Sequence, residues 1–282
     1  MERYLNVAVM MLEALFLLWG AKQLWGVVLR RDMNTELTTH DNPAVAITLA
    51  GYFFGVLIAL AGVAAAPGSG GREDLLSFAA FGAAGVLVLF LSLFAAPLVG
   101  GIKLRRDILE QRNVSAAMVL AATFIATGLI FSGAVRGEGA GLAAWVALFL
   151  FQLLGQVVLA LMAHLFEYVT PYDLHLQITE GQNPAAAVGY AGALVAMGVI
   201  LQNAVLGDIA YLATDWTSEV RTFLIWCAPL LLLWPVRSLV VNGLLLGFGN
   251  LNREISEDRN VGVGVIEAVT YIGFAWVLVS VA

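Results

Sequence analysis

Three ionisable side chains lie deep inside long apolar runs of this 282-residue sequence. Glu13 stands in the first of these runs, Arg237 in the seventh and Glu267 in the eighth. A charged group at membrane depth is costly, and those that occur usually pair with one another, line a solute path or relay protons. These three residues are therefore the first candidates for chemistry.

Arg237 and Glu267 are expected to lie near each other. Arg237 stands about nine residues before the end of its run and Glu267 seven residues after Asn260, which places both roughly 10–14 Å from one membrane face at about 1.5 Å per residue. The two runs are adjacent and antiparallel, which favours an ion pair. That pair is either a structural salt bridge between two helices or an ion- or proton-coupled gate. Leu120 occupies the position of Glu267 in the first half of the chain, so the charge pair is confined to the second half.

The sequence offers no enzyme-like constellation. It has one cysteine, Cys227, and the spacing of His40, His164 and His175 fits no metal site. No Ser/His pair, paired Asp or metal motif occurs at depth, so we expect no catalytic residue, no cofactor and no metal. The net charge of −6 is dispersed among short loops, which gives no sign of nucleic-acid binding.

Four asparagines mark one segment that is repeated at intervals of 71, 70 and 77 residues: Asn42, Asn113, Asn183 and Asn260. Each closes a polar stretch and is followed by Pro or Val, so we expect each to be the N-cap of a helix. The alternative is that four helix N-termini on one membrane face form a partly positive vestibule that binds a ligand. Under that alternative the candidate binding residues are Glu13, Arg237, Glu267, Asn42, Asn113, Asn183 and Asn260.

Apolar residues stand nine and five positions before each Asn, and a tiny residue stands four positions after it. The i, i+4 spacing covers one face of a helical turn and predicts an amphipathic elbow at the membrane surface. Small residues let helices approach closely in lipid, so the helices that follow the asparagines are expected to be the inner ones. The apolar pairs are Met33 and Leu37, Leu104 and Ile108, Leu174 and Ile178, and Leu251 and Ile255; the small residues are Ala46, Ala117, Ala187 and Gly264.

The elements that must position these residues are membrane helices. The chain is 61% hydrophobic and 12% charged, whereas a soluble domain has about a quarter charged residues. Its apolar runs of about 20 residues suit a hydrocarbon core of ~30 Å. The runs are 4–28, 44–66, 75–100, 114–135, 141–166, 185–206, 221–246 and 261–282. Prolines at Trp226-Cys-Ala-Pro229 and Trp234-Pro235 predict an interrupted seventh helix.

We therefore predict an all-α, polytopic transmembrane bundle of eight helices, built as four parallel hairpin repeats. The two four-helix domains are 1–136 and 141–282, and the repeat suits pseudo-fourfold symmetry about the membrane normal. The odd-numbered loops hold eight Lys or Arg residues and the other side holds four, which predicts cytoplasmic Asn loops and both termini outside. The expected partners are the lipid bilayer and a homo-oligomer.

The repeated segments resemble the bacterial membrane family known as domain of unknown function 350. The resemblance rests on Thr170-Pro-Tyr-Asp173, Gln182-Asn183-Pro-Ala-Ala-Ala187 and Gly198-Val-Ile-Leu-Gln-Asn-Ala204, with echoes at Asp41 to Ile47 and Asn113 to Met118. It implies two tandem copies, a bacterial inner membrane and a partner similar to phage-shock protein A. It also implies Gly before each Asn, where this chain has Asp, Arg, Gln and Arg.

Two functions remain in competition. Parallel hairpins and buried charges favour a channel or transporter for an ion or small polar solute. The family setting favours a non-catalytic scaffold in membrane stress and envelope maintenance. An intramembrane enzyme acting on lipid is the third class, and the missing catalytic constellation speaks against it.

Overall fold

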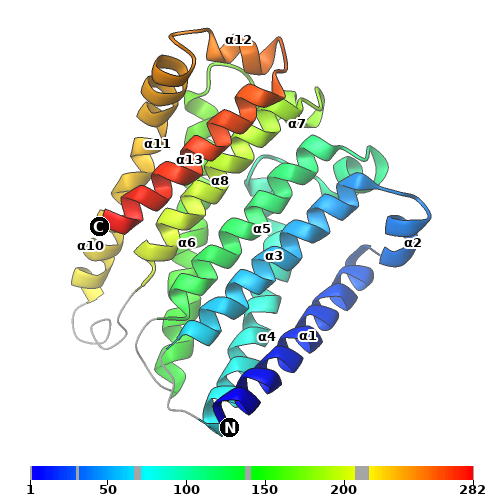
Figure 1. Cartoon of the computed structure of the whole chain (residues 1–282), viewed down its shortest axis with the longest axis vertical. Helices are drawn as coiled ribbons and strands as arrows, with labels where there is room; N and C mark the ends of the chain where they lie inside the picture. The colour runs from blue at the N-terminus through cyan, green and yellow to red at the C-terminus, as the bar shows by residue number, and fades with distance from the viewer. Residues whose placement is uncertain (1, 30–31, 67–70, 137–140, 207–215, 282) are drawn as a thin grey trace.

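The computed structural model describes residues 2–29, 32–66, 71–136, 141–206 and 216–281, and these are all-helical apart from short turns (Figure 1). Eight helices are long and apolar enough to cross a membrane, as the sequence predicts. They are α1 (Glu2–Leu29), α3 (Pro43–Ala65), α4 (Arg72–Ala95), α5 (Val114–Ala134), α6 (Gly141–Val169), α8 (Pro184–Ala204), a span Thr217–Leu245 and α13 (Val261–Val281).

The helices that follow the four asparagines form an inner row. In the order α3, α5, α8, α13 each packs along its neighbour, and all four begin at the same end (Figure 1). The contacts are close because glycine faces backbone: a side chain on Gly51 would strike Ala121 of α5, and one on Gly192 would strike Ala268 of α13. Close packing of small residues drives helix association in lipid.

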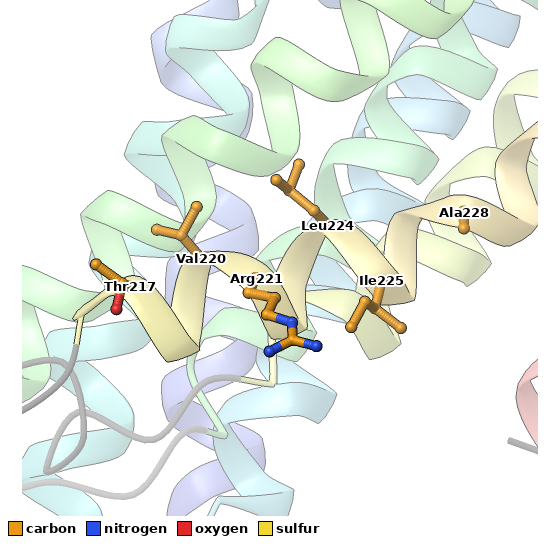
Figure 2. Close-up of a pocket in the computed structure, with 6 residues that line it drawn as sticks. All are labelled: Thr217, Val220, Arg221, Leu224, Ile225 and Ala228. Atoms are coloured by element: carbon orange, nitrogen blue, oxygen red, sulfur yellow. The ribbon is translucent and has the colours of Figure 1, made fainter.

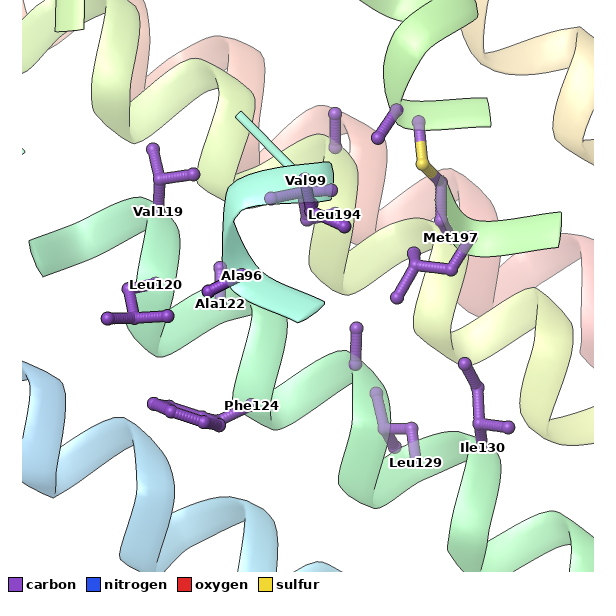
Figure 3. Close-up of a cluster of buried hydrophobic side chains, with 14 of the residues drawn as sticks. Ala96, Val99, Val119, Leu120, Ala122, Phe124, Leu129, Ile130, Leu194 and Met197 are labelled. Atoms are coloured by element: carbon purple, nitrogen blue, oxygen red, sulfur yellow. The ribbon is translucent and has the colours of Figure 1, made fainter. Parts of the chain in front are cut away.

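The middle of this row is the hydrophobic core. Figure 3 shows buried side chains of α5 and α8 around the short helix η1 (Ala96–Leu98). Phe124 and Leu194 are fully buried there, one on each side of the boundary between the two halves of the chain. The α5–α8 contact therefore joins the halves in the way that α3–α5 joins helices within the first half.

The other spans lie against the row. α4 packs on α3 and α5, α6 packs on α5 and α8, and the seventh span packs on α8 and α13. α1 packs on α4 and α3, at the edge of the molecule (Figure 1). Each of these helices except α1 thus lies against two neighbouring members of the row.

A closed fourfold arrangement, which the repeat suggested, is wrong. It would return α13 to α3, whereas these helices lie at opposite ends of the row (Figure 1). The reason is the position of the residues with which an inner helix meets its two neighbours. On α5, Ala121 meets Gly51 of α3 and Ala126 meets Gly198 of α8. At about 100° per residue these two positions point ~140° apart around the helix, whereas a four-membered ring needs ~90°.

Short helices precede the asparagines, as the apolar pairs predict. They are α2 (Met33–Thr38), η2 (Leu104–Glu110), α7 (Leu174–Thr179) and α12 (Leu251–Ser256), and η2 is a π-helix. Their inward residues Ile108, Ile178 and Ile255 are at most 1% exposed, so the elbows are anchored in the protein.

The seventh span is interrupted where its prolines predict. It runs from α10 (Trp216–Cys227) through a 3₁₀ segment, η3 (Ala228–Leu232), and three residues of α11 (Leu233–Pro235) into a π-helix, η4 (Val236–Leu245). Proline lacks the N–H that an α-helix needs and clashes with the preceding turn, which accounts for the changes at both places.

Candidate functional site

Arg237 and Glu267 form a buried ion pair. Arg237 Nε donates to Glu267 Oε1 at 2.7 Å, and the two residues are 7% and 2% exposed. The pair joins η4 of the seventh span to α13, and the contact predicted from depth is confirmed. At this burial water screens the charges weakly, so each stabilises the other's ionised form.

Three further side chains complete the site. Tyr271, one turn along α13, donates its hydroxyl to Glu267 Oε1 at 2.9 Å, and Arg237 Nη1 donates to Asn252 Oδ1 of α12 at 2.9 Å. The Arg237 guanidinium lies 5.9 Å from the centre of the Tyr172 ring, a cation–π distance. Burial, together with the Glu267 carboxylate, raises the pKa of Tyr172 to about 12, which keeps this ring neutral. Sequence reasoning missed these three; the i+4 spacing of Tyr271 from Glu267 was the available signal.

The site keeps one unused donor. Arg237 Nη2 is buried and has no hydrogen-bond partner among the described residues. A buried guanidinium N–H left unpaired is costly, so such groups usually meet water or a ligand oxygen. On the other side of the pair, a Cβ on Gly189 of α8 would lie 2.5 Å from Glu267 Oε2, so glycine makes room for the carboxylate.

The remaining charged candidate lies elsewhere. Glu13 belongs to α1, on the far side of the row from α13 (Figure 1). It is half-buried, with Oε2 unpartnered among the described residues. Leu120, the counterpart of Glu267, is buried in the apolar core. The structure thus groups two of the three predicted charges and leaves Glu13 apart.

All four asparagines are N-caps, as predicted. Their side-chain oxygens accept hydrogen bonds of 3.0–3.3 Å from backbone N–H groups at the start of α3, α5, α8 and α13. Ala44 and Val45 donate to Asn42, Ala116 to Asn113, Ala185 and Ala186 to Asn183, and Val263 to Asn260. Asn42, Asn113 and Asn183 are at most 1% exposed, whereas Asn260 is exposed. Each cap therefore uses one or two of the about four free N–H groups that a helix N-terminus would offer to an anion.

The first three of these asparagines also join one repeat to the next, which the sequence did not reveal. Asn42 Nδ2 donates to the carbonyl of Ile108 (3.2 Å), Asn113 Nδ2 to that of Ile178 (2.9 Å) and Asn183 Nδ2 to that of Ile255 (2.8 Å). Each acceptor is the residue five positions before the next Asn. Arg106 of η2 adds an ion pair with Glu180, which raises the pKa of Arg106.

The residue before each Asn has a left-handed backbone. The φ angles are 45° at Asp41, 51° at Arg112, 48° at Gln182 and 51° at Arg259. This region favours glycine, because a Cβ is strained there. The Gly-Asn pattern of the family that these segments resemble is thereby explained by backbone geometry.

The depression on the outer surface is separate from the ion pair. Figure 2 shows that its lining side chains, Thr217, Val220, Arg221, Leu224, Ile225 and Ala228, come from α10 and the first residue of η3. They are mostly apolar, as suits a lipid-facing surface. Among the described residues no group of three or more His, Cys, Asp or Glu side chains could hold a metal ion.

Comparison with known proteins yields one family. The model of the Domain of Unknown Function (DUF350) matches residues 1–135 and matches again at residues 140–282. No curated protein and no solved structure matches the chain.

Proposed function

The chain belongs to the DUF350 family as two tandem copies, and from this premise we propose that it carries an ion or small polar solute across the membrane. It is a multi-pass, all-helical membrane protein with eight candidate spans. The proposed polar centre of the path is the Arg237–Glu267 pair with Tyr271, Tyr172 and Asn252.

One observation carries this proposal: the buried charge pair lies where its helix is not α-helical. The π-helix η4 begins directly after Pro235, and Arg237 is its second residue. Discontinuous membrane helices recur at the binding sites of transporters, and π segments recur at functional sites. The unpartnered Nη2 of Arg237 gives this centre a donor for a solute oxygen.

We further propose the setting of the protein. The family membership favours a bacterial inner membrane location, and the loop charges favour the Asn elbows in the cytoplasm and both termini outside. The protein is then a non-enzymatic carrier without a cofactor, and a phage-shock-protein-A-like partner would meet it on the cytoplasmic face.

Ion flux in liposomes tests the function. Fluxes of H⁺, Na⁺, K⁺ and Cl⁻ are measured for the wild type, Glu267→Gln, Arg237→Gln and the double variant. Each single change should lower folded yield, because it leaves one charge buried and unpaired, and the double change should recover part of it. The folded double variant should lose the flux. Unchanged flux in a folded double variant would make the pair merely structural.

The second candidate is a membrane scaffold in envelope maintenance. It is favoured by the inner row, whose glycine–backbone contacts and interlocked asparagines suit a rigid platform. A scaffold predicts no flux for any of the four ions, and it predicts that the Arg237 and Glu267 variants act only through stability.

A further inference from the structure

The contacts within the inner row repeat in strict register. On each inner helix we define a leading face, the residues 2, 6, 9, 13, 16 and 20 positions after the Asn, and a trailing face, those 4, 8, 11, 15 and 19 positions after it. The leading face of one helix packs on the trailing face of the next. The same positions meet at successive contacts. Position 9 of the leading face meets position 8 of the trailing face, position 13 meets position 15, and position 20 meets position 19. The pairs are, in that order, Gly51 with Ala121 and Gly192 with Ala268; Gly55 with Gly128 and Ala126 with Gly198; and Gly62 with Ser132 and Gly133 with Gln202.

Both ends of the row leave one such face uncovered. The leading face of α13 is exposed along its whole length: Gly262, Ile266, Val269, Gly273, Trp276 and Ser280. On the trailing face of α3, Ala46, Ala50, Leu57 and Ala61 are exposed and Phe53 is half-buried. The most apolar stretch of α13 is only 33% buried, against 83% for α5 and 78% for α8, which have neighbours on both faces.

The hydrogen-bond relay between repeats is open at the same two ends. Three asparagines donate to the elbow of the following repeat, whereas Asn260 donates to Glu254 Oε2 of its own elbow. The first elbow supplies Leu37, the counterpart of Ile108, Ile178 and Ile255, and none of the four asparagines donates to its carbonyl.

α1 shows the same missing neighbour. α4, α6 and the seventh span each rest on two members of the inner row, while α1 rests on α3 and on α4. Its most apolar stretch is 11% buried, the lowest of the eight spans. If a further inner helix packed on the trailing face of α3, α1 would contact two members of the inner row, as the other three spans do.

We propose that the occupant of both faces is a second copy of this chain, docked head to tail. The leading face of α13 in one copy packs on the trailing face of α3 in the next, and Asn260 reaches the carbonyl of Leu37. Such a heterologous contact continues the row from copy to copy. It is continuous with three contacts that the chain already makes within itself, and Gly273, which has nothing within 4 Å of a Cβ, takes the place that Gly55 holds in the α3–α5 contact.

Disulfide trapping between two differently tagged chains tests the register. Both chains carry Cys227→Ala. One also carries Gly273→Cys, 13 positions after Asn260, and the other carries Leu57→Cys, 15 positions after Asn42, because these two positions meet at the contacts within the chain. The matched control replaces Gly273→Cys with Phe274→Cys, which lies at the same depth, is 38% exposed and points about 100° away. After co-expression and oxidation in native membranes, the mixed-tag dimer should exceed the control several-fold.

Four results would overturn the proposal. Equal trapping in both pairs, or a dominant Gly273→Cys self-dimer, would overturn the head-to-tail contact, since a self-dimer indicates face-to-face packing. A second variant, Gly273→Trp, should keep the wild-type melting temperature in dilute detergent, below the concentration at which copies associate, and yet reduce the particle in lipid nanodiscs to one copy. A wild type that is already monomeric in nanodiscs, or a Gly273→Trp assembly of unchanged mass, would also overturn the proposal.

Discussion

At the scale of single residues, the side chain of each of the first three asparagines makes two kinds of hydrogen bond. The oxygen caps a helix of its own repeat and the nitrogen binds the elbow of the next, as at Asn183 with Ala185 and Ile255. Asparagine alone among the common capping residues offers an acceptor and an N–H donor together. Its presence in the first three repeats follows from that pair of functions, while Asn260 caps its helix and donates to Glu254 of its own elbow.

The two jobs can be separated by substitution. Asn183→Ala should cost about 2 kcal/mol of unfolding free energy, about 1 for the cap and about 1 for the buried bond to Ile255. Asn183→Asp keeps the acceptor and should lose the second part. Asn260→Ala, at the exposed fourth position, should cost about 1 kcal/mol in a single-copy preparation. Equal losses at Asn183 and Asn260 in thermal denaturation would contradict the double role.

The left-handed residue before each Asn carries strain that glycine would relieve. An L-residue in this region costs ~1–2 kcal/mol of folding free energy. Glycine avoids that strain, but it loses more backbone freedom on folding, which cancels part of the gain in stability. Gln182→Gly should therefore raise stability by roughly 0.5–1 kcal/mol, and Gln182→Ile should lower it. The order of the melting temperatures checks this, and a less stable glycine variant would refute the strain.

At the scale of elements, close approach between helices depends on positions where only hydrogen or a methyl group fits. Gly55 of α3 and Gly273 of α13 hold the same place in the repeat, yet a side chain at Gly55 meets Phe124 and Leu89 while one at Gly273 meets nothing within 4 Å. The sequence shows that both positions are glycine, whereas only the packing shows that a neighbouring helix covers Gly55 and that none covers Gly273.

This contrast gives a matched pair of variants. Gly55→Val should destabilise the folded monomer by about 1–3 kcal/mol or more, because overpacking forces α3 away from α5. Gly273→Val should leave the monomer's stability within about 0.5 kcal/mol of wild type. Denaturation of each variant in detergent, below the concentration at which copies associate, compares them. Similar losses would show that the row is not packed as described.

At the scale of the whole molecule, the sequence predicts what is local and repeated. The eight spans, the caps, the elbows and the Arg237–Glu267 pair follow from spacing and depth. The open row did not, because the Asn period reports that helices repeat and not which faces they share. The sequence did not predict Asn252 and Tyr172 for a related reason: α12, which carries Asn252, and the turn before α7, which carries Tyr172, meet Arg237 only through tertiary packing. Ala46, whose small side chain predicted close packing, is exposed because it lies on the uncovered face of α3 at one end of the row.

A high-resolution cryo-EM map of the protein in lipid nanodiscs tests the central claim, a polar path at Arg237 and Glu267, most directly. The account predicts ordered water or an ion beside Arg237 Nη2, connected to at least one membrane face along η4 and α13. A map in which Arg237 and Glu267 are sealed by protein on both sides, with no water near either group, would contradict a transport path there.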